Sequence, residues 1–382
     1  MKIRKLYFKI ALNHLKRCDF GWIFDNLIKI PLLFLSCRTG KALCGPILGG
    51  LLLTYKCNYH CRFCGLTEKI PDYEKQYGRE FDTSQFKRMI DGLVDMGVSA
   101  IGFTGGEPLL RKDAVELMTY AKSKKRVVHL STNGALLTSA IIEALLNIKI
   151  DALNISLDGP TEESHDFIRG AGSFISVIAN TRQLVQARNV RRAATLINIV
   201  SVVNRKNIAD VTDLVRLAKE IGADSVGFMP VLVSHGRAKQ ELSVEDLSAA
   251  DAQIDALIKL KQNDGFIDSS ENYLSLFKLA LRGLPSPLTC YAGYTTMIID
   301  CYGNVFPCFP WIEENRSIVN IKGDKRNLKT ILYSPEYMAA HKIIKECRSC
   351  YWNCHTEMNL WFQSPDITPV EFENKGRSSH SP

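Results

Sequence analysis

Three cysteines in one short stretch of the chain are the residues best suited to chemistry. Cys57, Cys61 and Cys64 follow the spacing C-x3-C-x2-C. Three thiolates on one loop can hold three corners of a [4Fe–4S] cube, which normally takes four cysteine ligands. The fourth iron is then free to bind a substrate-like ligand, so this loop predicts an iron–sulfur cluster with one open position.

Two other interpretations of these cysteines are weaker. Structural zinc takes four ligands, usually from paired C-x2-C or Cys/His groups, and no such partner pair lies nearby in the sequence. The chain contains 12 cysteines in 382 residues, so cysteines without a special role are the other alternative. The spacing, together with the motif described next, favours the cluster.

A glycine-containing turn follows about forty residues after the cysteine loop, at 103–108 (FTGGEP). It ends a short apolar run that is typical of a strand. Gly105 and Gly106 let the backbone approach a small ligand closely. Glu107 offers a carboxylate to a ligand ammonium group, and Pro108 fixes the turn. The turn alone is weak evidence for function, but together with the cysteine loop it is strong evidence.

The two motifs together resemble the radical S-adenosylmethionine (radical SAM) superfamily. The resemblance implies that SAM binds the open iron through its amino and carboxylate groups, with the Gly105-Gly106-Glu107 turn at the methionine amino end. It also implies that Phe63 lies beside the adenine. The implied activity is reductive cleavage of SAM to methionine and a 5′-deoxyadenosyl radical, which removes a hydrogen atom from an unactivated substrate carbon.

Strand-like and helix-like segments alternate from about residue 49 to residue 233, which predicts an α/β fold with a parallel sheet covered by helices. Six strands match the partial (β/α)6 barrel that the resemblance implies. In such barrels the chemistry lies at the carboxyl ends of the strands, where both motifs fall. The expected strands are 50–55, 100–104, 127–131, 152–156, 196–203 and 225–230, and the expected helices are 82–96, 113–123, 139–146, 174–188, 208–221 and 243–261.

Further candidates for SAM contacts lie on or after the fourth expected strand. Ser156 shares one face of that strand with Asn154, and polar groups in a buried strand need partners. By resemblance, Ser156 and Asp158 bind the ribose hydroxyls and the methionine end of SAM. The alternative for Asp158 is a local turn with the glycine and proline that follow it. Arg169 suits bidentate binding of the SAM carboxylate, or it is a surface arginine.

A second set of cysteines lies in the C-terminal part of the chain. Cys290 and Cys308 flank a segment that reads as a β-hairpin with an Asp/Gly/Asn turn, and Cys347, Cys350 and Cys354 form C-x2-C-x3-C. A hairpin pair and a distant C-x2-C can close four ligands around one cluster, and a four-cysteine zinc site is the alternative. The arrangement resembles the SPASM/twitch extension of radical SAM enzymes, which implies an auxiliary [4Fe–4S] cluster.

The C-terminal set is shorter than the full SPASM pattern, which serves two auxiliary clusters. No cysteine follows Cys354, and this favours a single auxiliary cluster as in the twitch form. We expect Cys290, Cys308, Cys347 and Cys350 to bind it, with Cys354 either replacing one of them or remaining free. The cluster is expected to accept an electron from the product radical or to relay one to the first cluster.

The formal net charge of +8 is concentrated at the N-terminus, where residues 1–45 carry +7 of it. The nearly neutral remainder argues against nucleic-acid binding by a basic face. Twelve cysteines in close sets, without a cleavable signal peptide, indicate metal ligands in a reducing cytoplasm and not disulfides. An oxygen-sensitive cluster also indicates an anaerobic or low-oxygen setting.

Residues 1–45 mix basic and apolar side chains. No charge-free stretch reaches 18 residues, which argues against a transmembrane helix. Lys and Arg together with Trp, Phe and Leu are typical of an interfacial amphipathic helix. This interpretation predicts peripheral contact of residues 1–35 with the inner face of the membrane. The alternative is a helix packed on the barrel or at a dimer interface.

The sequence thus predicts a radical SAM enzyme, and its N-terminal segment leads us to expect a lipid or membrane-near substrate. A peptide-modifying maturase is the alternative, and another small molecule stays open. A non-catalytic electron carrier is the alternative of a different class, but a carrier needs no SAM site. The expected partner is an electron donor such as flavodoxin or ferredoxin. The expected divisions are an N-terminal segment at 1–47, a barrel at 48–240, a helical linker at 241–288, an auxiliary cluster domain at 289–362 and a disordered tail at 363–382.

Overall fold

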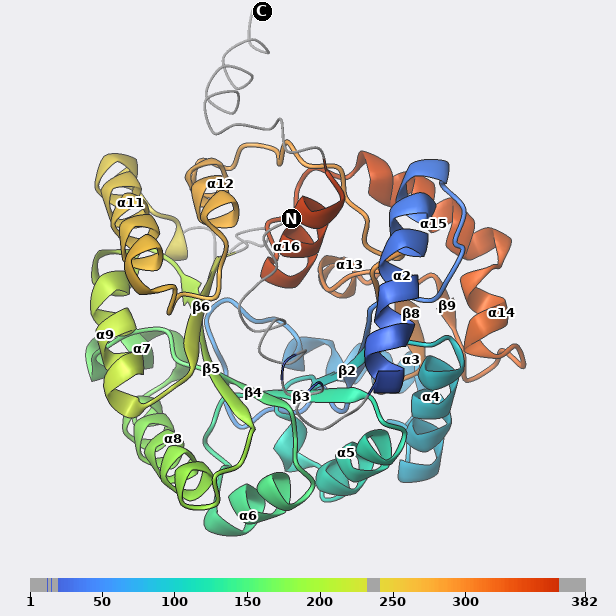
Figure 1. The fold of residues 1–382 in the computed structure, drawn as a ribbon, viewed down its shortest axis with the longest axis horizontal. Helices are drawn as coiled ribbons and strands as arrows, with labels where there is room; N and C mark the ends of the chain where they lie inside the picture. Colours follow the sequence, from blue (N-terminus) through green and yellow to red (C-terminus); the bar gives the residue numbers. More distant parts are fainter. Residues whose placement is uncertain (1–11, 13–14, 16–19, 232–240, 364–382) are drawn as a thin grey trace, which may run out of the picture.

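The computed structural model describes residues 12, 15, 20–231 and 241–363 of the chain (Figure 1). The strands that it describes form one sheet in the order β6-β5-β4-β3-β2-β1-β7-β8-β9. The six strands β1 to β6 run parallel to one another, as the α/β barrel prediction requires. The strands are β1 Leu48–Leu52, β2 Ala100–Thr104, β3 Val127–Thr132, β4 Ala152–Ser156, β5 Leu196–Val203, β6 Ser225–Pro230, β7 Thr296–Ile299, β8 Asn304–Phe306 and β9 Val319–Asn320.

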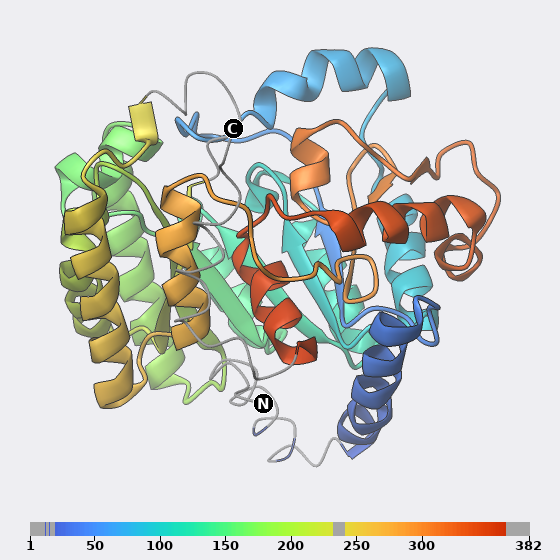
Figure 2. The same ribbon diagram turned by 90° about the horizontal axis from the view of Figure 1, so that it is seen from above.

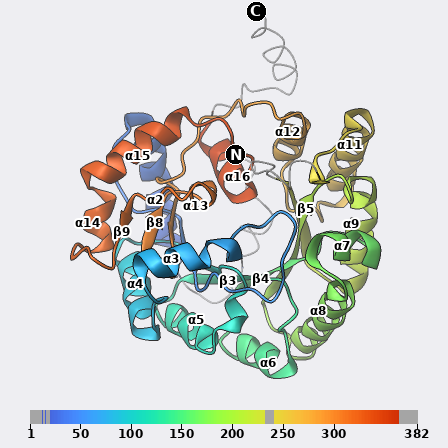
Figure 3. The same ribbon diagram turned by 180° about the vertical axis from the view of Figure 1, so that it is seen from behind.

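The helices surround this sheet on its outer side and close the gap between its two edges (Figures 1 and 3). Helix α4 begins at a capping box, in which the Asp82 side chain accepts from the Gln85 amide at 2.8 Å and Gln85 accepts from the Asp82 amide at 2.9 Å. The larger helices are α2 Phe20–Thr39, α3 Ile70–Tyr77, α4 Thr83–Asp95, α5 Ala114–Ser123, α6 Ser139–Asn147, α7 Glu162–Arg169, α8 Ser173–Val190, α9 Val211–Ile221, α11 Leu247–Asp264, α12 Glu271–Leu281, α15 Pro335–Glu346 and α16 Asn353–Phe362, and the shorter ones are α13 Pro310–Glu313 and α14 Leu328–Leu332.

The predicted hairpin forms as β7 and β8, but it is continuous with the barrel sheet. Strand β7 pairs with β1 in parallel, from Leu48 opposite Thr296 to Leu51 opposite Ile299. The buried carboxylate of Asp300 holds the hairpin turn, because it accepts from Asn304 and from the hydroxyl of Tyr55 at 2.7 Å. The C-terminal cysteine segment therefore extends the same sheet that carries the first cysteine loop.

The segment predicted as a helical linker is part of the barrel wall. Helices α11 and α12 pack against each other, and α12 packs on β6. Between them, Ile267 forms a parallel bridge with Val226 of β6. Most of the tail predicted at 363–382 lies outside the described residues, so its expected disorder stays a prediction.

Helix α2 lies at the amino ends of the strands, away from the cysteine loop (Figure 2). The indole of Trp22 donates to the carbonyl of Ser99 at 3.0 Å, and the buried Lys29 ammonium donates to the carbonyls of Pro46 and Gly97. Leu33 and Cys37 are buried in a second cluster near the C-terminal end of the helix. The alternative of a helix packed on the barrel is thus correct for one face of α2. By its length and composition, α2 is also able to span a membrane. This is weak evidence for a membrane span, because signal sequences near the N-terminus have the same length and composition.

Candidate functional site

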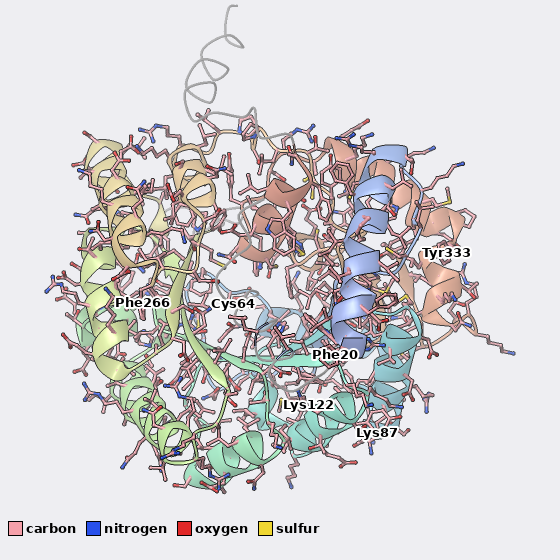
Figure 4. The ribbon with its side chains drawn as sticks, viewed as in Figure 1. Phe20, Cys64, Lys87, Lys122, Phe266 and Tyr333 are labelled. Carbon is pink, nitrogen blue, oxygen red and sulfur yellow. The ribbon has the colours of Figure 1, made fainter. Side chains whose placement is uncertain are left out.

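A cavity of about 570 Å³ occupies the lumen of the barrel. Its walls are the inner faces of β1 to β6, the first turn of α16 and the N-terminal half of α2. All three cysteines of the first loop line it at the carboxyl ends of the strands. Figure 4, viewed along the barrel, shows Cys64 within the ring of strands and helices. The cavity therefore extends from the cysteine loop through the barrel to α2.

The cysteine loop is fixed by the elements that follow β3 and β4. The amide of Arg62 donates to the carbonyl of Ile168 at 3.0 Å. Asn133, after β3, donates to the Asn58 side chain at 2.8 Å and lies 3.9 Å from the sulfur of Cys57. Burial raises the pKa of Cys57 and of Cys61, so binding of a metal cluster there releases protons.

The glycine turn packs directly on the start of the cysteine loop. The amide of Gly106 donates to the carbonyl of Thr54 at 2.8 Å, and the amide of Glu107 donates to that of Lys56 at 2.9 Å. Gly105 has a φ of +141°, and a Cβ at Gly105 or Gly106 would lie 2.4 or 2.3 Å from a carbonyl oxygen of this segment. Side chains are excluded here, so the turn brings its backbone into the lumen beside the cysteines.

The carboxylate of Glu107 does not face the lumen. It is fully buried and accepts hydrogen bonds from the hydroxyl of Thr132 and from the amides of Asn133 and Leu109. Burial raises the pKa of Glu107, and these hydrogen bonds oppose the shift. From the sequence, this carboxylate is expected to bind the ammonium group of the ligand. In the structure it instead joins the glycine turn to the end of β3, and Gly105 and Gly106 are the residues of the turn that line the cavity.

Arg169 is a buried arginine and not a surface one. Its guanidinium donates to Asp158 at 2.6 Å, lies 3.8 Å from the sulfur of Cys61 and lies over the ring of Phe63 at 5.6 Å. Burial disfavours its charge, but Asp158 and Cys61 hold the pKa of Arg169 above its ordinary value. Arg169, Phe63 and Ser156 line the cavity. These three predicted residues are therefore brought together beside the cysteine loop.

Asp158 holds the side chain of Arg169 in position. Its carboxylate is fully buried and also accepts from the amide of Val202 at 2.8 Å, which ties it to β5. The sequence leads us to expect that Asp158 contacts SAM. In the structure, its carboxylate oxygens instead accept from Arg169 and from the amide of Val202 on β5. The backbone amide of Asp158 donates to the ring of His165 at 3.0 Å, so the segment after β4 is held by several buried bonds.

Sequence reasoning did not identify a row of polar side chains across the middle of the lumen. Asn198 on β5 donates to Asn154 at 3.1 Å and accepts from Ser225 on β6 at 2.8 Å. Asn154 in turn donates to Ser131 on β3 at 3.4 Å. The signal was present, because Ser131, Asn154, Asn198 and Ser225 are polar residues in strands that are mostly apolar. Their adjacency requires the strand register, in which Ser131 lies opposite Asn154 and Asn154 opposite Asn198.

Four cysteines of the second set lie close enough for each thiol to shift the pKa of others. Cys290 follows α12, Cys308 follows β8, Cys347 ends α15 and Cys350 lies in the next loop. Burial raises the pKa of Cys290 to about 11 and holds the pKa of Cys350 well above its ordinary value, and their neighbouring thiols add to both shifts. Within the described ranges, no group of His, Cys, Asp or Glu is arranged to hold a single metal ion. An all-cysteine donor set is the ligand type of an iron–sulfur cluster, and four cysteines are also able to bind zinc.

Two further cysteines belong to the C-terminal part of the chain. Cys354, in the first turn of α16, lines the lumen together with Trp352 and Asn353. Cys301 is buried beside the hairpin turn, with its sulfur 3.6 Å from the carboxylate of Glu80.

Comparison with known proteins agrees with this geometry. Residues 51–235 match the sequence model of the radical SAM superfamily, and residues 290–354 match that of the SPASM iron–sulfur cluster-binding domain. The chain therefore belongs to the radical SAM superfamily and has a SPASM domain at its C-terminal end. Enzymes with these domains use SAM, a [4Fe–4S] cluster and auxiliary iron–sulfur clusters.

Two curated relatives and one solved structure illustrate the similarity. The AdoMet-dependent heme synthase of Methanosarcina barkeri is 29% identical over 67% of this chain and 72% of its own length. The mycofactocin maturase MftC of Mycobacterium tuberculosis is 30% identical over 70% of this chain and 66% of its own length, so the chain spans about two thirds of that relative. The structure of Streptococcus suis SuiB bound to the precursor peptide SuiA aligns with a TM-score of 0.62, at 16% identity, over 80% of this chain and 69% of that one.

Proposed function

We propose that this protein is a radical SAM enzyme that removes a hydrogen atom from a carbon atom of a substrate held in the barrel lumen. The observation that carries the proposal is the meeting of the cysteine loop, the glycine turn and the Arg169 group around one cavity. When bound, SAM and the reduced cluster supply a 5′-deoxyadenosyl radical. The residues around the cavity bind, orient and shield these groups.

Each residue of this group has a proposed role. Cys57, Cys61 and Cys64 bind the first cluster. The backbone of Gly105 and Gly106 meets the methionine amino end of SAM. Arg169 has one guanidinium edge on Asp158, and its charge suits the SAM carboxylate.

Two further residues complete the SAM site in this proposal. Phe63 contacts the adenine, and Ser156 contacts the ribose. Glu107 and Asp158 are positioning residues, since their carboxylates are buried and bonded to the chain. This division differs from the sequence expectation, in which both carboxylates contact SAM.

For the auxiliary site, we propose that Cys290, Cys308, Cys347 and Cys350 hold one cluster. Cys354 lies in the wall of the lumen. The auxiliary cluster would accept an electron from the substrate-derived radical, and an external donor such as flavodoxin or ferredoxin would reduce the first cluster. Electrons must enter and leave a site that is shielded from water, and a second cluster near the lumen provides one route.

The substrate class best supported by the relatives is a peptide. One relative is named a maturase, and SuiB has been solved with a precursor peptide. The row of amides and hydroxyls across the lumen, Ser131, Asn154 and Asn198, offers donors and acceptors to a peptide backbone or a polar side chain. These residues lie between the cysteine loop and the basal half of the cavity.

An apolar chain is the second candidate, because the basal half of the lumen carries apolar side chains. Leu48, Ala100, Val127 and Ala152 begin four adjacent strands there, and Trp22 packs against them. A peptide backbone in this half would leave polar groups without partners, which is costly, whereas an alkyl chain would not.

Isotope transfer distinguishes the two substrate classes. Cells carrying the chain would be grown in deuterated medium, and peptide and lipid fractions would each be added to reconstituted protein with unlabelled SAM. The enzyme's own substrate transfers deuterium to 5′-deoxyadenosine, and the mass of the 5′-deoxyadenosine then rises by about one unit. Transfer from the peptide fraction supports the first candidate, and transfer from the lipid fraction supports the second. Absence of transfer from both fractions and from a total small-molecule extract, while SAM is cleaved, would contradict hydrogen abstraction from a cellular substrate. Cys61→Ala is the control and should give no 5′-deoxyadenosine with any fraction.

A further inference from the structure

The outward face of α2 is an exposed apolar stripe. Phe20 and Phe24 are 62 and 63% exposed, and Ile28 and Leu35 are 49 and 47% exposed. Leu27, at the edge of the stripe that borders the lumen, is 66% exposed. These positions recur at three- and four-residue intervals, so they share one side of the helix. The opposite side is the one that holds Trp22, Lys29 and Leu33 on the barrel. A contiguous exposed apolar face of this kind marks an interaction surface.

Basic residues lie at the same end of the barrel as this stripe, at the turns that lead into the strands. Lys125, Lys149 and Arg192 precede β3, β4 and β5 and are exposed to solvent. Within the described part of the chain, none of the three forms an ion pair. Lys124, Lys125 and Arg126 share a small surface hollow with Phe20, Trp22 and Asp25. Arg126 pairs with Asp25 and Lys124 with Asp91, so Lys125 is the cation that adds unpaired charge next to the apolar stripe. At the other end of α2, the guanidinium of the exposed Arg38 lies 4.2 Å from the ring of Phe34.

The backbone at these three turns has an unusual conformation for residues that carry a side chain. Lys125, Lys149 and Arg192 have φ values of 56°, 53° and 49°, in the left-handed region where side chains are disfavoured. The equivalent turns after α4 and α9 carry Gly97 and Gly222, with φ values of 74° and 86°. Glycine therefore fits this fold at such turns, yet three neighbouring turns carry a long basic side chain in a strained conformation.

We propose that the stripe on α2 and these basic turns form a docking surface for an anionic lipid bilayer. An apolar helix face bordered by Lys and Arg is the arrangement that binds at the boundary between headgroups and acyl chains. The positive border is complementary to anionic headgroups. The inference does not depend on the substrate, but the same half of α2 lines the basal end of the lumen.

The test is flotation of the full-length chain with vesicles of phosphatidylcholine and phosphatidylglycerol at low salt. The protein should float with these vesicles, be released at high salt and bind pure phosphatidylcholine much more weakly. Phe24→Glu together with Leu35→Glu should weaken partitioning at least about 100-fold, because two apolar side chains are lost from the interface. Ile175→Glu is the matched control, since Ile175 is a 61% exposed apolar residue at the start of α8, on the opposite side of the barrel, and it should float like the unchanged chain.

The electrostatic part is tested with Lys149→Gly together with Arg192→Gly, which suit the left-handed turns. Each charge is worth about five-fold, or about 1 kcal/mol, near an anionic bilayer, so this variant should partition about 25-fold more weakly. Lys112→Gln with Lys206→Gln removes the same charge from exposed positions elsewhere and should have little effect.

Two results would overturn the proposal. One is unchanged flotation of the Phe24/Leu35 variant, which would mean that α2 is not the docking face. The other is a stable dimer of the unchanged chain that the same variant converts to monomer, with no flotation of either, which would mean that a second copy covers the stripe.

Discussion

The two ends of the barrel lumen differ in how their side chains are held. At the carboxyl ends of the strands, charged side chains are buried and paired, as in Asp158 with Arg169. At the amino ends, apolar side chains of α2 are exposed, and basic residues lie at strained turns. One end is built to hold charged groups at fixed positions, and the other to meet a large apolar and anionic surface.

This difference shows which substitutions should be severe. Buried polar groups are costly when they lose a partner, so the carboxyl end should tolerate few changes. Exposed residues at the amino end should affect stability little, whatever their importance for binding. The predictions that follow test the two ends against each other.

The largest expected effect on stability is at the buried ion pair. Asp158→Ala leaves the guanidinium of Arg169 buried without its charge partner, which should lower the free energy of unfolding by about 3–5 kcal/mol. Denaturant unfolding of the reconstituted protein measures this. Glu241→Ala, which breaks the exposed pair with Arg62, is the control and should cost no more than about 1 kcal/mol. Equal losses in the free energy of unfolding for the two variants would show that a buried ion pair at this end contributes no more to stability than an exposed one.

A smaller loss is expected at the glycine turn. Glu107→Gln places an amide NH₂ among groups that donate to the carboxylate, so stability should fall by about 1–3 kcal/mol. SAM binding, measured by equilibrium dialysis, should weaken more than the iron content falls. A loss of iron with unchanged SAM affinity of the remaining loaded protein would contradict the positioning role of Glu107.

Filling the basal lumen should separate substrate binding from SAM cleavage. Ala152 lines the cavity at the start of β4, and Ala152→Phe occupies space there without touching the cysteine loop. The abortive cleavage of SAM should stay within about two-fold, whereas deuterium transfer from substrate should fall about ten-fold, or about 1.4 kcal/mol. Equal loss of both activities would mean that the basal lumen supports the SAM site and does not receive substrate.

The smallest effect is expected at a basal turn and has the opposite sign. Lys149→Gly relieves a left-handed conformation, so the free energy of unfolding should rise by about 1 kcal/mol or less. Gly222→Lys introduces the same strain after α9 and should lower it by a similar amount or more, because its Cβ would also lie 2.9 Å from Val185. A loss of stability in the Lys149 variant would mean that its side chain stabilises the fold itself.

Much of the fold was predictable because local patterns sufficed. Strands β2, β4, β5 and β6 have the predicted bounds, since each is a short apolar run in an alternating series. The continuity of the sheet through β7 was not predictable, because it depends on pairing between Leu48–Leu51 and Thr296–Ile299. No local pattern encodes contacts between segments so distant in the sequence.

The candidate site was predictable in its residue types but not in their orientation. The sequence predicts Phe63 from its place in the cysteine motif and Arg169 from the suitability of arginine for a carboxylate, and the two do meet beside Cys61. The inward burial of the Glu107 and Asp158 carboxylates depends on donors from β3 and β5, which the motif itself does not contain. The lipid expectation rests on the N-terminal composition, whereas one of the two relatives reported above is named a maturase, which supports the peptide alternative.

The most direct test of the account compares the two cysteine sets in anaerobically reconstituted protein given SAM and a strong one-electron reductant. The unchanged chain should hold about eight irons and release 5′-deoxyadenosine. Joint replacement of Cys57, Cys61 and Cys64 by Ala should leave about four irons and abolish 5′-deoxyadenosine formation. Joint replacement of Cys347 and Cys350 should also remove about four irons but leave abortive SAM cleavage in place. SAM cleavage by the first variant, or stoichiometric zinc in place of iron at the second site, would contradict the account.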